Sequence, residues 1–219
     1  MSTALEATGF MMGIISWLVT GAALANDYWK ISSVSGSVIV SQRLFENLWH
    51  ACAENSAGLA ECRDFESMLA LPVHMQVCRA LMIISLMLGL SCMIVSLLGM
   101  KFIKIGSAAD QSKAKLALTG GIMSILAGLC CMIACSWYAS RVVQDFKNPL
   151  YGGVRFEMGT GLYIGWAGAC LGILGGGFLC SSCKRLSPEG KNGGLYGKPP
   201  QKIYTATARS EPDSPKAYV

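Results

Sequence analysis

Two cysteines and a short turn sequence are the residues of this chain whose types and spacing best support chemistry. Cys52 and Cys62 lie ten residues apart, with Asn-Ser-Ala-Gly at positions 55–58 between them. That tetrapeptide is typical of a turn between two short strands, and cross-strand cysteines near a turn can meet the geometry of a disulfide. An oxidising compartment would favour the bridge. The spacing therefore predicts a Cys52–Cys62 disulfide.

The rest of the sequence gives little support for a catalytic or metal-binding site. The two histidines, His50 and His74, belong to no convincing catalytic or metal-ligand constellation. Cys180 and Cys183 form a Cys-x-x-Cys pair, but no second pair or nearby histidine completes a site. Palmitoylation beside a membrane is the preferred interpretation of this pair, over metal or redox chemistry. The sequence predicts no enzyme, no cofactor and no metal.

Four uncharged stretches must position these residues, and each has 19 to 25 residues: 7–25, 80–100, 116–140 and 159–183. A helix rises about 1.5 Å per residue, so roughly 20 residues cross a hydrocarbon core about 30 Å thick. The backbone must satisfy its own hydrogen bonds there, so each stretch is predicted to be a helix. The Ala-Leu-Ala at 23–25 resembles a signal-peptide cleavage site, but the acidic Glu6 and the long apolar run favour an uncleaved helix.

The distribution of charge predicts the topology. Segment 101–115 has four lysines and one aspartate, and segment 184–219 has seven basic and three acidic residues. Segment 27–79 has four basic and six acidic residues. Basic loops stay on the cytoplasmic side. We therefore expect both termini (1–6 and 184–219) and loop 101–115 inside the cell, with loops 26–79 and 141–157 outside and the fourth span at 158–183.

The first outer loop has the composition of a small sheet. Residues 28–34 and 37–40 are rich in β-branched side chains around Gly36, which predicts a hairpin, and 44–49 and 59–65 predict further strands. Residues 67–71 predict a short helix before Pro72. In the fourth span, regularly spaced glycines predict close helix packing and no phosphate loop; they are Gly161, Gly165, Gly168, Gly172 and Gly176.

Trp29, Asn47-Leu48-Trp49, Cys52 and Cys62 follow the order and spacing of the claudin signature W…G-L-W…C…C, and the chain resembles the claudin family. Asn47 departs from the usual glycine. The match extends to Arg79, to the second loop and to the last four residues, Lys-Ala-Tyr-Val. The resemblance implies a membrane protein with a left-handed bundle of four transmembrane helices under an extracellular antiparallel five-stranded sheet. It also implies polymerisation into tight-junction strands at the plasma membrane of epithelial cells.

Several contacts are implied by the same resemblance. Met68 would enter a neighbour's pocket built around Phe146 and Met158, while other claudins would be bound in cis and in trans. The trans-contact loop would contain Asn148, Pro149 and Leu150, and a PDZ scaffold would bind Tyr218 and Val219.

Membrane lipid and permeating inorganic ions complete the expected partners. Nucleic acid is not expected, because no basic patch is interleaved with aromatic residues. Aromatic rings settle at the lipid–water boundary, where Trp29 and Trp49 are expected.

Two functional questions stay open at this point. Related four-span adhesion or channel-auxiliary proteins share the tryptophan and cysteine pattern. A claudin may also either seal the gap between cells or line an ion pore. Segment 30–74 has three basic and five acidic residues, which favours a cation-permissive pore. Asp64 is the expected selectivity residue, with Glu46 and Glu66 secondary. Asn55 stands where cation-selective members carry an acid, and Arg63 adjoins Asp64.

Overall fold

A computed structural model of the chain describes residues 3–32, 42–65, 67, 71–99, 110–148 and 155–184. Its four helices are α1 (Thr3–Ala25), α2 (Val73–Gly99), α3 (Asp110–Lys147) and α4 (Thr160–Lys184). Each is long and apolar enough to cross a membrane. The prediction of four spanning helices is confirmed.

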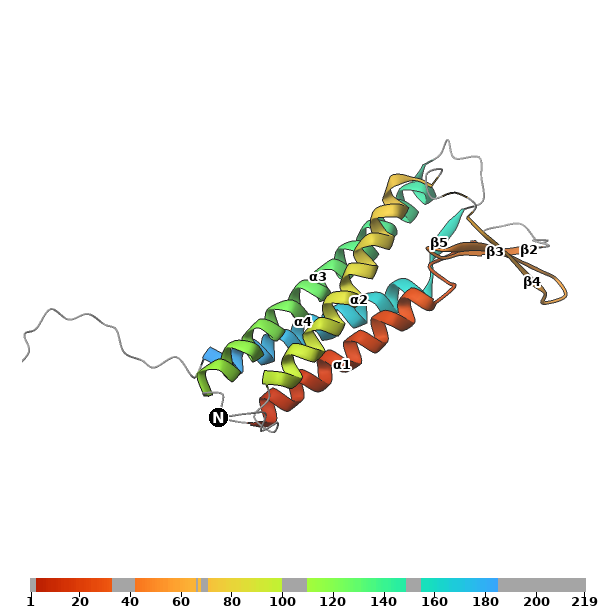
Figure 1. The fold of residues 1–219 in the computed structure, drawn as a ribbon. Coiled ribbons are helices and arrows are strands. Elements are labelled where there is room, and N and C mark those ends of the chain that lie inside the picture. Colours follow the sequence, from red (N-terminus) through yellow and green to blue (C-terminus); the bar gives the residue numbers. More distant parts are fainter. Residues whose placement is uncertain are drawn as a thin grey trace, which may run out of the picture. The chain divides into compact units, whose positions relative to one another are not determined.

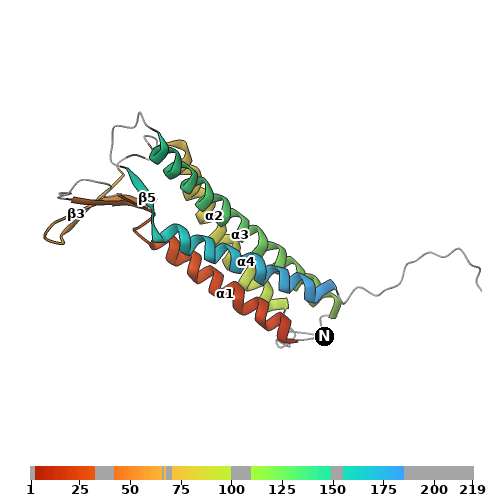
Figure 2. The same ribbon diagram turned by 180° about the vertical axis from the view of Figure 1, so that it is seen from behind.

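The helices run side by side as a bundle, with the sheet at one end (Figures 1 and 2). The extensive contacts join α2 to α3, α3 to α4 and α4 to α1, while α1 and α2 touch less. Large apolar side chains such as Leu18, Met87 and Ile133 are about half exposed or more on the outer surface of the bundle. A helix surface of this kind is suited to contact lipid rather than water.

Small and hydroxyl side chains hold the interior of the bundle. Ser16 Oγ donates to the Gly168 carbonyl at 2.8 Å, and Ser124 Oγ donates to the Gly172 carbonyl at 2.9 Å. A Cβ added at Gly176 would lie 2.6 Å from the Gly121 carbonyl oxygen. Close backbone approach and hydrogen bonds between helices are the forces that associate helices in lipid. The packing interpretation of the α4 glycines is therefore confirmed.

One five-stranded antiparallel sheet has the order β4-β3-β2-β1-β5. The strands are β1 (Lys30–Ser32), β2 (Gln42–Glu46), β3 (His50–Asn55), β4 (Ala60–Asp64) and β5 (Phe156–Met158). The fifth strand comes from the segment between α3 and α4 and pairs with β1, so the segments that follow α1 and α3 form a single sheet. The fold class implied by the claudin resemblance is confirmed in its four helices and five strands.

The hairpin predicted around Gly36 is only partly described. Its first strand is β1, which pairs with β2 on one side and with β5 on the other. Its second strand, 37–40, lies outside the described residues. Strand β1 begins at Lys30 rather than at residue 28, because the carbonyls of Tyr28 and Trp29 instead accept hydrogen bonds from Gly161 and Gly159 at the start of α4. Residues 33 and 34 lie outside the described part of the chain.

Two helices extend beyond the uncharged stretches that locate them. Helix α2 begins at Val73, directly after Pro72, and α3 continues through Lys147. Residues 73–79 and 141–147 are thus helical, although the sequence assigns them to outer loops. Absence of charge marks the membrane core, whereas a helix ends where its backbone must turn. The residue before a proline disfavours the α conformation, and Pro149 follows Asn148. The predicted short helix at 67–71 is not seen at Ser67 and Leu71, which are not helical; residues 68–70 lie outside the described part.

The glycine contacts lead to a test with an adjacent control. Gly176→Ala should destabilise the protein by about 1–3 kcal/mol, because its methyl group would meet the Gly121 carbonyl and the Ile125 backbone. Gly177→Ala on the same helix should leave stability unchanged or raise it, because nothing lies within 4 Å of its added Cβ. Thermal unfolding of the two variants in the same detergent distinguishes them. Equal midpoints would contradict the described α3–α4 packing.

Candidate functional site

The predicted disulfide joins the last two strands of the sheet. Cys52 of β3 and Cys62 of β4 stand opposite each other with Cα atoms 4.0 Å apart. Asn55 closes the turn beyond them, since its Oδ1 accepts hydrogen bonds from the amides of Ala57 at 3.0 Å and Leu59 at 3.1 Å. Gly58 takes the left-handed conformation with φ at 78°. Both the disulfide and the turn are confirmed, and Asn55 has a structural role in the turn.

The Asn47-Leu48-Trp49 motif forms a buried turn between β2 and β3. Asn47 is only 1% exposed, and its Oδ1 accepts hydrogen bonds from the amides of Trp49 at 2.7 Å and His50 at 2.8 Å. Its Nδ2 donates to Asp27 Oδ1 at 3.1 Å. A glycine would supply neither side-chain bond. The departure from the family pattern therefore adds a connection between this turn and the segment that follows α1.

Trp29 lies at the centre of the contact between the sheet and the bundle. Its ring is fully buried and packs edge-to-face on Tyr138 of α3, with ring centres 5.2 Å apart. Its Nε1 donates to the carbonyl of Ala23 at 2.8 Å, which satisfies a carbonyl in the last turn of α1. The ring is enclosed and therefore does not contact lipid, while the expectation that Trp29 lies at the level of the lipid–water boundary stays a prediction. Trp49 is half-buried.

Arg79 of α2 attaches the Leu48 turn to the bundle. The Arg79 side chain is buried, and its Nε donates to the Leu48 carbonyl at 2.5 Å. The guanidinium also lies 4.9 Å from the ring centre of Trp49 and 5.6 Å from that of Phe65. Leu48 itself is fully buried in the same core as Trp29. The signature residues, distant in sequence, therefore form one junction between sheet and helices.

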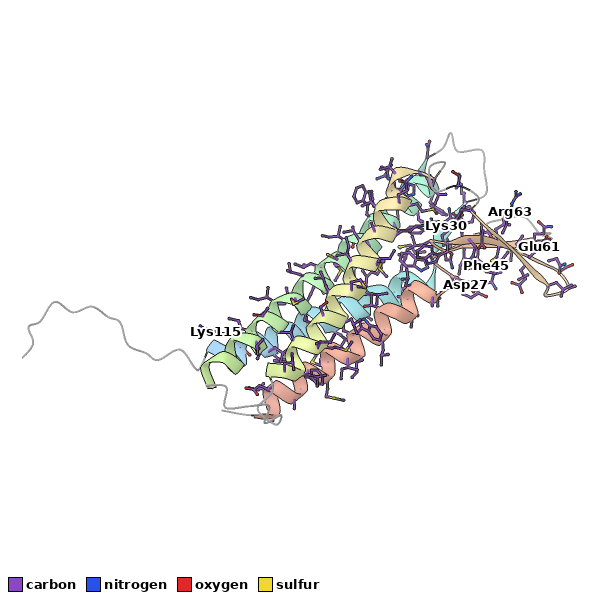
Figure 3. All side chains as sticks on the ribbon, in the orientation of Figure 1. Asp27, Lys30, Phe45, Glu61, Arg63 and Lys115 are labelled. Atoms are coloured by element: carbon purple, nitrogen blue, oxygen red, sulfur yellow. A yellow bond between two sulfur atoms is a disulfide. The ribbon has the colours of Figure 1, made fainter. Side chains whose placement is uncertain are left out.

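Charged side chains lie along the sheet, with Glu61 and Arg63 farther from the bundle and Asp27 and Lys30 close to it (Figure 3). The Asp64 side chain, at the end of β4, is 93% exposed. Glu46 forms an ion pair with Lys30 at 2.7 Å, and both side chains are largely buried. A hollow of about 600 Å³ lies between the sheet and the helix ends. Its charged or titratable lining residues are Lys30, Glu46, Arg63, Asp64, His74 and Asp145. Asp64 is therefore exposed, as are Glu61 of β4 and Glu157 of β5, whereas the charge of Glu46 is locally balanced.

A family model described as PMP-22/EMP/MP20/Claudin family matches residues 3–179. The chain belongs to this family. Claudin-15 of Mus musculus is 42% identical over 215 residues, which cover 97% of this chain and 95% of the relative. Claudin-7 of Homo sapiens is 40% identical, covering 83% of this chain and 87% of the relative. Claudin-19 of Homo sapiens is 40% identical, covering 87% and 85%.

Within the family, segments 45–49 and 67–71 predict a chain most similar to claudin-15, with claudin-10 close. The similarity to claudin-15 is confirmed over nearly the whole chain. Claudins are structural proteins rather than enzymes, so the prediction of no catalytic activity is confirmed by family membership. The claudin signature at Trp29, Leu48, Trp49 and Arg79 is, in this structure, a junction that fixes the sheet on the bundle.

The predicted contact residues of this claudin are only partly described. Phe146 and Met158 line one apolar groove of about 320 Å³, with the other lining residues Val142, Val143, Phe156, Glu157 and Tyr163. Asn148 is exposed just after α3, whereas Pro149 and Leu150 lie outside the described residues. Also outside the described residues are Met68, Glu66, Tyr218, Val219 and the side chain of Cys183. Cys180 is half-buried near the end of α4, with Sγ 4.0 Å from the Leu118 carbonyl.

Sequence reasoning missed one cluster beside the signature. His50 Nε2 lies 3.1 Å from Asp27 Oδ1, and His50 Nδ1 lies 3.9 Å from Asp64 Oδ1. His50, Cys52 and Cys62 have the proximity of a metal site, with potential ligand atoms within 4.8 Å. The two sulfurs are joined in the disulfide, however, and metals bind the thiolate form. Only the alternation of side chains on β3 and β4 could have signalled the pairing of His50 with Asp64.

The junction makes Arg79 a sensitive position. Arg79→Ala should destabilise the protein by about 2–4 kcal/mol, since it removes a hydrogen bond from a charged donor and two cation–π contacts. Arg141→Ala, which removes an exposed arginine from α3, is the matched control and should cost less than about 0.5 kcal/mol. Thermal unfolding in detergent measures both. Similar midpoints for the two variants would refute the anchoring role of Arg79.

Proposed function

We propose that this claudin polymerises into tight-junction strands and lines a path between epithelial cells that is permissive to cations. The observation that carries the proposal is the Asp64 side chain, 93% exposed at the end of β4. The disulfide holds that strand against β3, and Arg79 holds the start of β3 against α2. The Asp64 carboxylate is therefore exposed to water at the end of a strand that the disulfide and Arg79 hold in place.

The magnitude of the interaction is sufficient for selectivity. A carboxylate about 4 Å from a permeating ion attracts a cation by roughly 1–4 kcal/mol at effective dielectric constants of 80 to 20. A difference of about 1.4 kcal/mol is already tenfold in an equilibrium constant. Salt screens charge over about 8 Å at physiological ionic strength, so only side chains close to the path count. Asp64 stands where cation-selective members of the family carry an acid, so we expect it to be the acid close to the path.

A sealing claudin is the second candidate, and specific observations favour it. The Lys30–Glu46 ion pair neutralises the charge of Glu46, so that this acid adds little to the attraction of cations. Asn55, in place of an acid, closes the β3–β4 turn. Arg63, next to Asp64 in sequence, is exposed. If the protein instead forms a conducting path, the same features predict only a modest preference for sodium over chloride, and not near-exclusion of the anion.

Lateral assembly would use the groove around Phe146 and Met158. The groove is apolar and open, and an unbranched methionine fills irregular apolar pockets well. We assign Met68 of a neighbouring claudin as the inserted side chain, with Asn148, Pro149 and Leu150 in the trans contact. Lys147, exposed beside the groove, departs from the more apolar residue of claudin-15 and would alter the fit.

The membrane orientation follows from charge. Both termini would lie in the cytoplasm, because the basic segments 101–115 and 184–219 flank the same ends of the helices. Cys180 and Cys183 would then be accessible to palmitoylation at the inner surface. Tyr218 and Val219 would add a strand to the sheet edge of a PDZ domain on a junctional scaffold.

The test of the proposed path is a charge series at one strand. Asp64→Asn should lower the sodium-to-chloride permeability ratio, and Asp64→Lys should tend to invert it, while strands persist. Dilution potentials across monolayers that lack endogenous claudins measure the ratio at matched junctional levels. The control is Glu61→Lys, which makes the same charge change on β4 three residues away, on the opposite face of the strand. An unchanged ratio in Asp64→Lys, or an equal shift in Glu61→Lys, would favour the sealing alternative.

A further inference from the structure

His50 lies between two carboxylates, one of which is the proposed selectivity residue. Its Nε2 faces Asp27 Oδ1 at 3.1 Å, and its Nδ1 faces Asp64 Oδ1 at 3.9 Å. We propose that His50 is a specificity-determining residue, whose protonation by extracellular acid neutralises Asp64 and lowers the cation preference of the path. This inference rests on the proposed cation path through Asp64.

The position of the imidazole is fixed by its surroundings. His50 is the β3 residue directly opposite Asp64 of β4, and its backbone amide donates to Asn47 Oδ1 at 2.8 Å. Asn47 Nδ2 in turn donates to Asp27 Oδ1, the same atom that contacts the ring. The His50 side chain is 25% exposed, so protons from the extracellular solution reach it. Asn47, where the family usually has glycine, thus orders both the histidine and its aspartate partner.

The chemistry follows from the two ring nitrogens. A neutral imidazole carries one N–H and can donate to only one of the two carboxylates, whereas the imidazolium has an N–H on each side. The distance of 3.9 Å to Asp64 is too long for a hydrogen bond but lies within the range of an ion pair. A protonated His50 therefore places a positive charge beside Asp64. Histidine is the side chain that ordinarily titrates between pH 5 and 8.

Other charged groups near the sheet do not ordinarily titrate in that interval. On the face that His50 shares with Asp64, the registers place Arg43 on β2, Glu54 on β3 and Glu157 on β5. On the opposite face they place Lys30, Glu46, Glu61 and Arg63. Arg63 and Asp27 are seen on opposite sides of the sheet in Figure 3. Ordinary carboxylates titrate near pH 4, and lysine and arginine above pH 10.

The second histidine provides a matched control. His74 lies in the first turn of α2 and lines the hollow that Asp64 borders, together with Lys30, Glu46 and Asp145. Within the described residues, His74 has no carboxylate oxygen within ion-pair distance. It is therefore a second histidine beside the same hollow that lacks the pairing of His50 with Asp64.

The experiment compares dilution potentials at pH 7.5 and 5.5 across monolayers expressing wild type, His50→Gln, His74→Gln or Asp64→Asn. The wild-type sodium-to-chloride ratio should fall by about two- to fivefold at pH 5.5, the range that exposed ion pairs span. His74→Gln should show the same fall. His50→Gln and Asp64→Asn should each abolish it, because one member of the pair is missing. A full pH response in either of these two variants overturns the inference.

Two outcomes separate this inference from the proposed function. If Asp64→Asn lowers the ratio at pH 7.5 but His50→Gln keeps the pH response, the cation path stands and the role of His50 is refuted. If Asp64→Asn leaves the ratio at pH 7.5 unchanged, the path itself is refuted, and the inference with it. Asp64→Asn does not alter His50, so its pH response tests the pairing even where His50→Gln fails to reach the junction.

Discussion

The five-stranded sheet depends on a buried junction in which the helices bind its backbone. Arg79 of α2 donates to the Leu48 carbonyl, and the Trp29 indole donates to the Ala23 carbonyl at the end of α1. The amides of Gly159 and Gly161 donate to the carbonyls of Trp29 at 2.9 Å and Tyr28 at 2.8 Å. Buried backbone groups without partners would be costly, so these bonds fix how the chain leaves and re-enters the bundle. A small sheet alone would be marginally stable in water.

The junction explains why charges on the sheet can act at fixed positions. The turn at Asn47 and Leu48 begins β3, and the disulfide attaches β4 to β3. The helices thus hold the turn before β3, and the disulfide joins β3 to β4, at whose exposed end Asp64 lies. The Lys30–Glu46 pair is held closer to the bundle and has no comparable exposure. Exposure distinguishes Asp64 from Glu46, although Glu61 of β4 and Glu157 of β5 are exposed as well.

The architecture could be predicted from the sequence because its signals are strong. Uncharged stretches located four helices, and the spacing of Cys52 and Cys62 around a turn located the disulfide. The positions of individual side chains could not be predicted in the same way. Trp29 is a residue type typical of the lipid–water boundary, but its ring is enclosed by Tyr138 of α3 and by the start of α4 at Gly161. The addition of β5 to the first loop's sheet, the Lys30–Glu46 pair and the His50 cluster all require strand registers, which depend on long-range pairing.

The attraction of cations by the field of a fixed, water-exposed carboxylate can be tested on the wild-type protein. The measurement is the sodium-to-chloride permeability ratio at matched osmolarity and pH 7.5, over ionic strengths from about 0.01 to 1 M. The screening length falls from about 30 Å to about 3 Å over this interval. If the field of an exposed carboxylate causes the selectivity, the ratio should decline steadily towards that of free diffusion as salt is raised. A ratio independent of ionic strength would contradict it, because selectivity would then not arise from the field of an exposed charge.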